Sequence, residues 1–209
     1  VVFAAIATAM IALIVSTIQL RKASDAVAAA TINRYDAYLL ADEMRQSSDD
    51  LTRLARTFVV SGGEAKWEKQ YFAILDIRNG KAPRPQHYER IYWDFVAAGD
   101  NKPRPDDKTI PLLDLMKQTG FSDAELAKLD EAKRNSDALV NIETVAMNMV
   151  KGLYRDAQGN YTVNKAPNLE EARKMMHDDS YHKEKAKIMK PVLEFFVLLD
   201  ERTQGQVER

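Results

Sequence analysis

Residues 1–20, VVFAAIATAMIALIVSTIQL, contain no charged side chain, no proline and no glycine. A helix rises about 1.5 Å per residue, so about 20 residues span roughly 30 Å, the thickness of the hydrocarbon core of a bilayer. We therefore expect a transmembrane helix here. The alternatives are a cleaved signal peptide, for which Ala28–Ala30 offers a small-residue cleavage site, and a buried core helix. The apolar region of a signal peptide is usually only about 7–15 residues long, which favours the anchor.

The two residues that follow the apolar stretch, Arg21 and Lys22, are both positively charged. Positive flanks prefer the cytoplasmic side of a bacterial membrane. This pair is a weak argument for placing residues 21–209 in the cytoplasm, and it has to be weighed against the argument from resemblance given below.

The composition favours one all-helical domain behind the apolar stretch. The 209 residues are 45% hydrophobic and 29% charged, with a net charge of −1 and no cysteine. Residues 21–209 suffice for a single domain with its own core. The near-neutral charge gives no reason to expect nucleic acid as a partner, and the lack of cysteine excludes disulfides and thiolate metal sites. Only 8 Gly and 7 Pro favour helices throughout.

The segment from Leu20 to Ser61 has neither Pro nor Gly, so one helix can run through it from the membrane. Its second half carries a seam at alternating spacings of four and three, which is typical of helices in bundles and compatible with a dimer. The seam consists of Leu40, Met44, Ser47, Leu51, Leu54, Phe58 and Ser61. Gly62–Gly63 ends this helix, and a short helix is expected over 64–78.

Residues 79–111 differ in character from the rest of the chain. They hold five of the seven prolines and two copies of Pro-Arg-Pro, at 83–85 and 103–105. Proline stiffens loops without adding hydrogen bonds. Between the two copies we expect a short aromatic helix from His87 to about Ala98. A long Pro-rich aromatic insertion is where we expect a helical bundle to carry residues for a specific function.

The clearest helix start is Ser122, which forms a capping box with Glu125, while Phe121 and Leu126 are placed as a hydrophobic staple. We expect this helix to follow a short one at 110–119 and to continue to about Tyr154. Its predicted seam consists of Leu129, Ala132, Ser136, Leu139, Ile142, Ala146, Met149 and Leu153.

The last third of the chain is also read as mainly helical. We expect a short extended piece at 161–163, a short helix after the N-cap Asn168, and a long helix from Ser180 to about Arg202. Pro191 should kink that helix or remove one of its hydrogen bonds. The predicted fold is all-α: a transmembrane helix that continues into an elongated up-down helical bundle with short inserted helices.

Five features of the chain match one known design. They are the stem 1–20, the helix ending in FVVSG (58–62), the stretches DIRNGKAPRP (76–85) and YERIYWDF (88–95), and the late MKPVLEFF (189–196). Together they resemble the periplasmic sensor domain of bacterial methyl-accepting chemotaxis proteins, of the four-helix-bundle type with an insertion. The resemblance implies a ligand-sensing homodimer in the inner membrane, a second membrane helix after Arg209, and a cytoplasmic signalling module. It is our reason for expecting residues 21–209 in the periplasm.

Two other functions stay open at this point. The same input domain could serve a histidine kinase or a nucleotide cyclase, or the chain could be a membrane-anchored structural or partner-binding bundle without a small ligand. No glycine-rich phosphate loop and no hydrolase or metalloprotease motif is present, so we expect neither an enzyme nor a cofactor.

The first candidate for a ligand pocket is the stretch from Arg78 to Asp94. Arg78 and Arg90 could clamp a carboxylate, whereas aromatic walls with Asp94 would suit an amine. The aromatic walls would come from Trp67, Tyr71, Tyr88, Tyr92 and Trp93. The alternative is that these aromatics attach the insertion to the bundle while the arginines pair with Asp76 and Asp94.

Two further groups of polar residues deserve a hypothesis. Arg34, Tyr35 and Arg45 lie where related receptors bind ligands between subunits, although only their position supports a site and we favour a solvated helix face as the explanation. His177 and His182 are five residues apart, a spacing that does not place two ligands on one helical face, so we expect no metal site.

Overall fold

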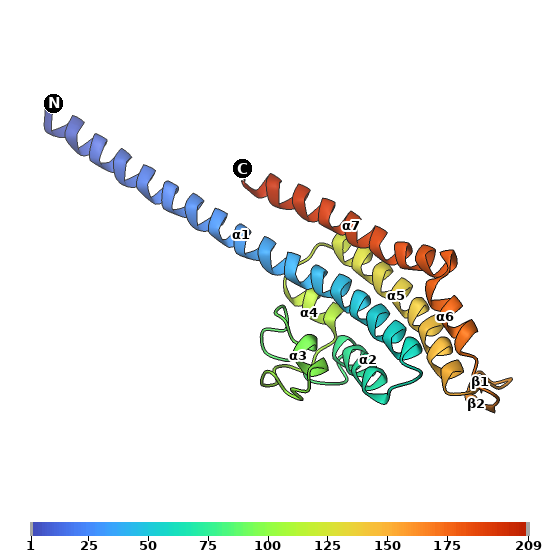
Figure 1. Cartoon of the computed structure of the whole chain (residues 1–209). Coiled ribbons are helices and arrows are strands. Elements are labelled where there is room, and N and C mark those ends of the chain that lie inside the picture. Colours follow the sequence, from blue (N-terminus) through green and yellow to red (C-terminus); the bar gives the residue numbers. More distant parts are fainter. Residues whose placement is uncertain (1, 208–209) are drawn as a thin grey trace.

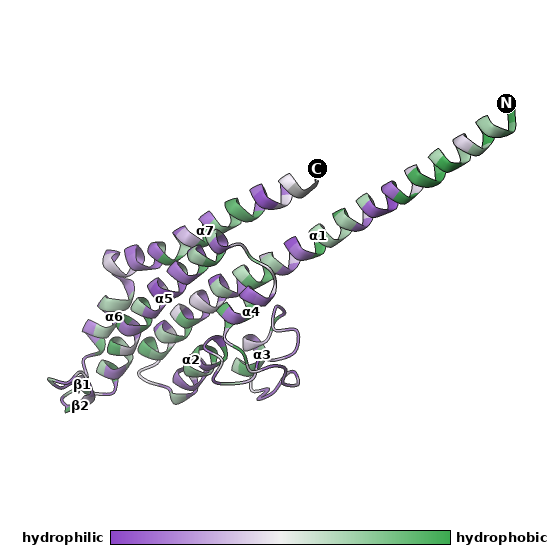
Figure 2. Cartoon of the chain, turned by 180° about the vertical axis from the view of Figure 1, so that it is seen from behind, coloured by the Kyte–Doolittle hydropathy of each residue, from purple (hydrophilic) through white to green (hydrophobic). Residues whose placement is uncertain are grey.

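The computed structural model describes residues 2–207, and its longest element is a single helix, α1 (Val2–Val60). The first buried residue of α1 is Ala37, so the N-terminal half projects away from the rest of the molecule (Figure 1). This projecting half is long and apolar enough to cross a membrane, and none of its apolar window is buried. In Figure 2 the ribbon of this half is coloured as mostly hydrophobic toward its free end. The expected unbroken helix is confirmed.

Three long segments of the bundle share one axis, two in one direction and the third in the opposite direction. Helix α5 (Asp123–Val150) runs parallel to α1, while α6 (Leu169–His177) and α7 (Asp179–Val207) run back along both. Contacts at both ends fix the directions: Arg34 of α1 meets Asp200 near the end of α7, and Thr52 meets Tyr181 near its start. The expected elongated up-down bundle is therefore confirmed.

A fourth segment is formed by α2 (Ala65–Arg78) and α4 (Leu112–Gln118). Helix α2 is antiparallel to α5, because Glu68 contacts Lys151 at one end and Arg78 contacts Ser136 at the other. Helix α4 then packs on α1 and leads to the start of α5. The insertion 79–111 leaves between these two helices and returns to the same point, where Asn79 and Pro111 form an isolated bridge.

The core consists of two hydrophobic clusters stacked along the bundle. The cluster nearer the membrane segment joins α1, α4, α5 and α7; the farther one joins α1, α2, α5, α6 and α7 and includes Trp93 of the insertion. Burial of these apolar side chains is the main favourable term in folding. The most deeply buried large apolar members are Met44, Leu51, Leu54, Phe58, Ile74, Leu112, Met116, Leu129, Ile188 and Phe195.

Several predicted boundaries are confirmed. Ser122 accepts a hydrogen bond from the backbone N–H of Glu125 at 3.3 Å, and Glu125 accepts one from the N–H of Ser122 at 2.7 Å, so the capping box is present. Asn168 caps α6 through a bond from the N–H of Glu171 at 3.0 Å. Helix α7 continues through Pro191.

Two predicted helices are wrong in their extent. The helix expected to reach Tyr154 ends at Val150, because Gly152 adopts a positive φ of 73° and turns the chain into strand β1 (Leu153–Arg155). Strand β1 pairs antiparallel with β2 (Tyr161–Asn164), which confirms the extended piece expected there. The helix expected over 87–98 is only α3 (Trp93–Ala97), since His87 has a φ of 51° and the chain turns before Trp93.

Candidate ligand site

The neck of the insertion is built from the two Pro-Arg-Pro copies lying side by side. Pro85 and Asp106 form an isolated bridge, and the N–H of Gln86 donates to the carbonyl of Pro105 at 2.9 Å. The N–H of Arg84 donates to the carbonyl of Lys108 at 3.0 Å. Prolines restrict the backbone of both strands of this neck. The insertion is therefore an ordered body held at a fixed position beside α1 and α2.

The two arginines of the repeats hold opposite ends of this body. Arg84 points to the bundle, where it is buried, pairs with Glu43 of α1, and lies 5.5 Å from the centre of the Tyr88 ring. Arg104 instead donates to the carbonyls of His87 and Ile91 and so fixes the turn that precedes α3. Burial raises the pKa of Glu43 even though Arg84 opposes that change.

Three aromatic rings fill the space between the neck, α1 and α2. Trp93 is buried, and its indole N–H donates to the hydroxyl of Tyr88 at 2.8 Å. The rings of Tyr92 and Trp93 meet edge to face with centroids 5.0 Å apart. Burial raises the pKa of Tyr88, so that hydroxyl stays protonated at neutral pH. These rings separate two hollows, one on the α1 side and one on the α2 side.

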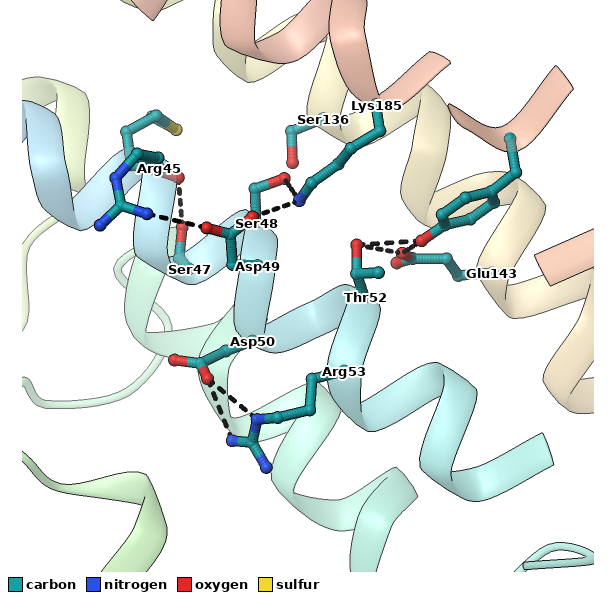
Figure 3. Close-up of polar contacts among 12 residues, drawn as sticks. Arg45, Ser47, Ser48, Asp49, Asp50, Thr52, Arg53, Ser136, Glu143 and Lys185 are labelled. Carbon is teal, nitrogen blue, oxygen red and sulfur yellow. Dashed lines mark hydrogen bonds and ion pairs between the residues drawn. The ribbon is translucent and has the colours of Figure 1, made fainter. Parts of the chain in front are cut away.

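The hollow on the α1 side is a cavity of about 140 Å³. Its charged lining is mostly acidic, with Glu43 and Asp50 from α1 and Glu89 and Asp94 from the insertion, against Arg90 alone. Asp50 also pairs with Arg53 at 3.0 Å (Figure 3), and burial raises the pKa of Asp50. A site of this kind favours a small organic cation.

The hollow on the α2 side is a larger cleft of about 580 Å³ between α2 and α3. Tyr92 and Trp93 form part of its wall, and Lys66 and Lys69 are the charged side chains that line it. A third cavity, of about 260 Å³, lies beside Arg84 and Glu43 at the neck. All three hollows touch the insertion, so concave surface surrounds it on its α1 side, its α2 side and at its neck.

The structure brings together most of the predicted site residues but not all. Tyr88, Arg90, Tyr92, Trp93 and Asp94 line the 140 Å³ cavity. Trp67 instead packs against the core and carries Lys66 over its ring at 4.5 Å.

Arg78 and Tyr71 belong to the interior of the bundle. Arg78 is 2% exposed and donates to Ser136 at 2.8 Å and to Asp137 at 2.9 Å, both on α5. Arg90 is exposed and lies 3.5 Å from Glu89. The expected clamp of Arg78 and Arg90 is therefore not formed, and neither arginine pairs as the alternative supposed.

A buried polar network in the bundle was missed by the sequence reasoning. Glu143 of α5 is 1% exposed and accepts hydrogen bonds from Tyr181 at 2.6 Å, from Tyr71 at 2.7 Å and from Thr52 at 3.3 Å. Figure 3 shows Thr52 and Glu143 pointing toward one another. Burial raises the pKa of Glu143 although these donors oppose it. Because the three donors come from α7, α2 and α1, this one carboxyl ties four helices together. Its spacing of four from Leu139 and three from Ala146 was the available signal.

A second polar contact joins α1 and α7 nearby. Lys185 donates to Ser48 at 2.8 Å and lies 2.9 Å from Asp49 (Figure 3). Burial lowers the pKa of Lys185. This contact attaches α7 to the same stretch of α1 that lines the 140 Å³ cavity.

The remaining candidate residues have ordinary partners. Arg34 pairs with Asp200 at 2.5 Å, and Arg45 pairs with Asp42 and Asp49 within α1, while Tyr35 is exposed. His177 lies 2.8 Å from the carbonyl of Arg173. Within residues 2–207, no group of three or more His, Asp or Glu side chains is placed to hold a metal ion.

No protein family, curated protein or solved structure matches this chain.

Proposed function

We propose that this chain is the ligand-sensing input region of a bacterial inner-membrane receptor, of the chemoreceptor type. The observation that carries the proposal is that α1 both lines the candidate site and continues without a break into the membrane segment. A ligand held between the insertion and α1 would therefore act directly on the helix that enters the bilayer. A histidine kinase or a cyclase could use the same input.

The course of α7 supports this proposal. It runs back along α1 toward the membrane segment, and the Arg34–Asp200 pair places residue 200 beside residue 34. From there α7 continues to Val207, which is about 10 Å farther toward the membrane at about 1.5 Å per residue. In our proposal α7 leads to a second membrane helix, so two helices connect the sensor to the bilayer, with the bundle in the periplasm.

Exposed apolar side chains near the membrane end support a homodimer. Ile32 and Tyr35 on α1 and Leu193 and Val197 on α7 are all exposed. Exposed apolar side chains are typical of a surface that a partner covers when they lie together. We propose that the partner is a second copy of the chain, as in receptors of this type.

The proposed mechanism is a shift between two arrangements of the bundle. A ligand that binds one arrangement more tightly raises its population, and packed helices commonly differ by about 1–2 Å between such states. The rigid α1 would carry that displacement from Glu43 and Asp50 to residue 20. The Lys185 contact with Ser48 and Asp49 would make α7 follow.

The experiment is a thermal-shift screen of the whole chain in lipid nanodiscs against amino acids, organic acids, amines and purines. Binding to the folded state alone stabilises it by about 2.7 kcal/mol at a hundredfold excess over Kd. We expect at least one class of compound to raise the unfolding temperature, and substitution of Trp93 by Ala to remove that effect. A folded chain that responds to no compound would contradict a small-molecule sensor and favour a partner-binding bundle.

A further inference from the structure

We infer that the cleft between α2 and α3 binds a small organic anion that carries an aromatic or branched apolar body and a hydrogen-bond donor. This inference rests on the proposed sensory function and names the class of ligand and its place. It differs from the expected Arg78 clamp, which the structure does not form. No residue of α1 that the structure describes lines the cleft, so its ligand would act on α1 through Tyr92 and Trp93, which also line the cavity on the α1 side.

The first argument is the charge of the cleft. Among the described residues that line it, Lys66 and Lys69 are the charged ones, and none is acidic. Lys66 also pairs with Glu64 at 3.3 Å, whereas Lys69 forms no ion pair within residues 2–207. The charged side chains that line the cavity across Trp93 are mainly carboxylates. The two faces of the same aromatic wall therefore select opposite charges, and the larger space selects an anion.

The second argument is a buried polar atom without a partner. Gln70 lines the cleft, is only 6% exposed, and its side-chain Oε1 accepts no hydrogen bond. A buried acceptor without a donor costs stability, and such atoms are rare in folded proteins. Oε1 is shielded from solvent in the free chain, so a turn of the amide toward the cleft would let an O–H or N–H group of a ligand supply the missing donor.

The third argument is the size and apolar character of the walls. Ala73 and Ile77 of α2 face Trp93 and Val96 across the cleft. A cavity of about 150 Å³ holds benzene, so a cleft of about 580 Å³ has room for a ring with a side chain. Ligand pockets typically have about this volume and this mixture of apolar walls with a few polar groups.

The test compares three matched compounds on the whole chain in lipid nanodiscs. These are 4-hydroxyphenylacetate, phenylacetate, which lacks the hydroxyl donor, and tyramine, which replaces the carboxylate by an ammonium group. Binding is measured by calorimetry and by the fluorescence of Trp93 in a Trp67→Phe background. We expect affinity to fall in the order 4-hydroxyphenylacetate, phenylacetate, tyramine.

Variants of the cleft separate its two recognition elements. Lys66→Gln with Lys69→Gln should weaken both acids at least tenfold without changing the unfolding temperature, because both lysines are exposed. Gln70→Leu should raise the unfolding temperature of the free chain and should weaken 4-hydroxyphenylacetate more than phenylacetate. Arg90→Gln, in the neighbouring cavity, is the control and should leave both acids unaffected.

Two results would overturn the inference. One is that none of the three compounds binds to the folded chain. The other is that tyramine binds best and loses affinity in Asp50→Asn, which would place the ligand in the acidic cavity. In either case a response to another compound in the wider screen would leave the proposed sensory function standing. If no compound in the whole screen binds, both this inference and the proposed sensory function are refuted.

Discussion

Arg78 and Arg90 are equivalent candidates in the sequence, and the structure assigns them opposite roles. Arg78 is 2% exposed and bound to Ser136 and Asp137, whereas the side chain of Arg90 is 65% exposed. We predict that Arg78→Ala destabilises the bundle and that Arg90→Ala leaves its stability unchanged.

The magnitude follows from the contacts that Arg78 makes. A hydrogen bond that involves a charged group contributes about 1.5–3 kcal/mol, and Arg78 makes two. Its guanidinium Nε has no partner, and the desolvation cost that the burial of Arg78 carries would be relieved on substitution. Asp137 would keep its ion pair with Lys133 at 2.6 Å, so the carboxylate of Asp137 would still have a partner. The free energy of unfolding should therefore fall by about 2–4 kcal/mol in Arg78→Ala.

The assay is thermal unfolding of the chain in lipid nanodiscs, followed by circular dichroism. For a domain of this size, 1 kcal/mol corresponds to about 2–4 °C, so Arg78→Ala should lower the midpoint by roughly 5–15 °C. Arg90→Ala should stay within about 0.5 kcal/mol of the parent. Arg78→Met keeps the apolar stem and should recover part of the loss. An unchanged midpoint for Arg78→Ala, or an equal loss for Arg90→Ala, would refute the assignment.

Three further predictions concern the neck, the pH response and a helix cap. Gly80→Ala should lower the unfolding midpoint more than Gly99→Ala. A Cβ at Gly80 would lie 2.4 Å from the backbone N of Pro111, whereas nothing lies within 4 Å of a Cβ at Gly99. Equal decreases of the midpoint would contradict the closed neck. The raised pKa of Glu143 means that the folded chain holds its proton more tightly than the unfolded chain, so this contribution to stability is lost as pH rises above about 4.5. Glu143→Gln should therefore become progressively more stable relative to the parent as pH rises above about 4.5 in urea titrations, and a pH-independent difference would argue against a buried proton. Ser122→Ala should cost about 1 kcal/mol through loss of the cap of α5, measured by the same titration, and no loss would show that the cap is not needed.

The helices could be predicted from the sequence wherever local signals agreed. The Pro- and Gly-free run to Ser61, the capping box at Ser122 and the N-cap at Asn168 each act within a few residues, and each is present. Of the β-hairpin, only the second strand was predicted. The first was assigned to the helix because Leu153 continues the apolar pattern of α5, whereas in the structure the chain turns at the positive φ of Gly152.

The long-range contacts of polar residues could not be predicted. Along α5 the buried positions include Ala132, Ser136, Leu139, Glu143 and Ala146, whereas the predicted seam has Ile142 in place of Glu143. Whether Glu143 is buried depends on hydroxyl groups from three other helices. Arg78 was misplaced for the same reason, since its partners lie on α5.

The two Pro-Arg-Pro copies show the same limit in the candidate site. Their shared sequence gives no hint that they lie side by side, or that Arg84 reaches Glu43 while Arg104 holds the turn before α3. The aromatic cluster was predicted as a group, and Tyr88, Tyr92 and Trp93 do meet. Which face of that cluster is acidic and which is basic depends on α1 and α2 together.

The central claim is that ligand binding at the insertion moves α1 relative to the rest of the bundle. The most direct measurement is the distance between spin labels at Ala28 of α1 and Ala138 of α5, in nanodiscs, with and without saturating 4-hydroxyphenylacetate or a compound found in the screen. Both positions are exposed, and the chain has no native cysteine to interfere. We predict a change of about 1–2 Å, with no change for a control pair at Ala138 and Glu170. Bound ligand with an unchanged distance would contradict transmission through α1.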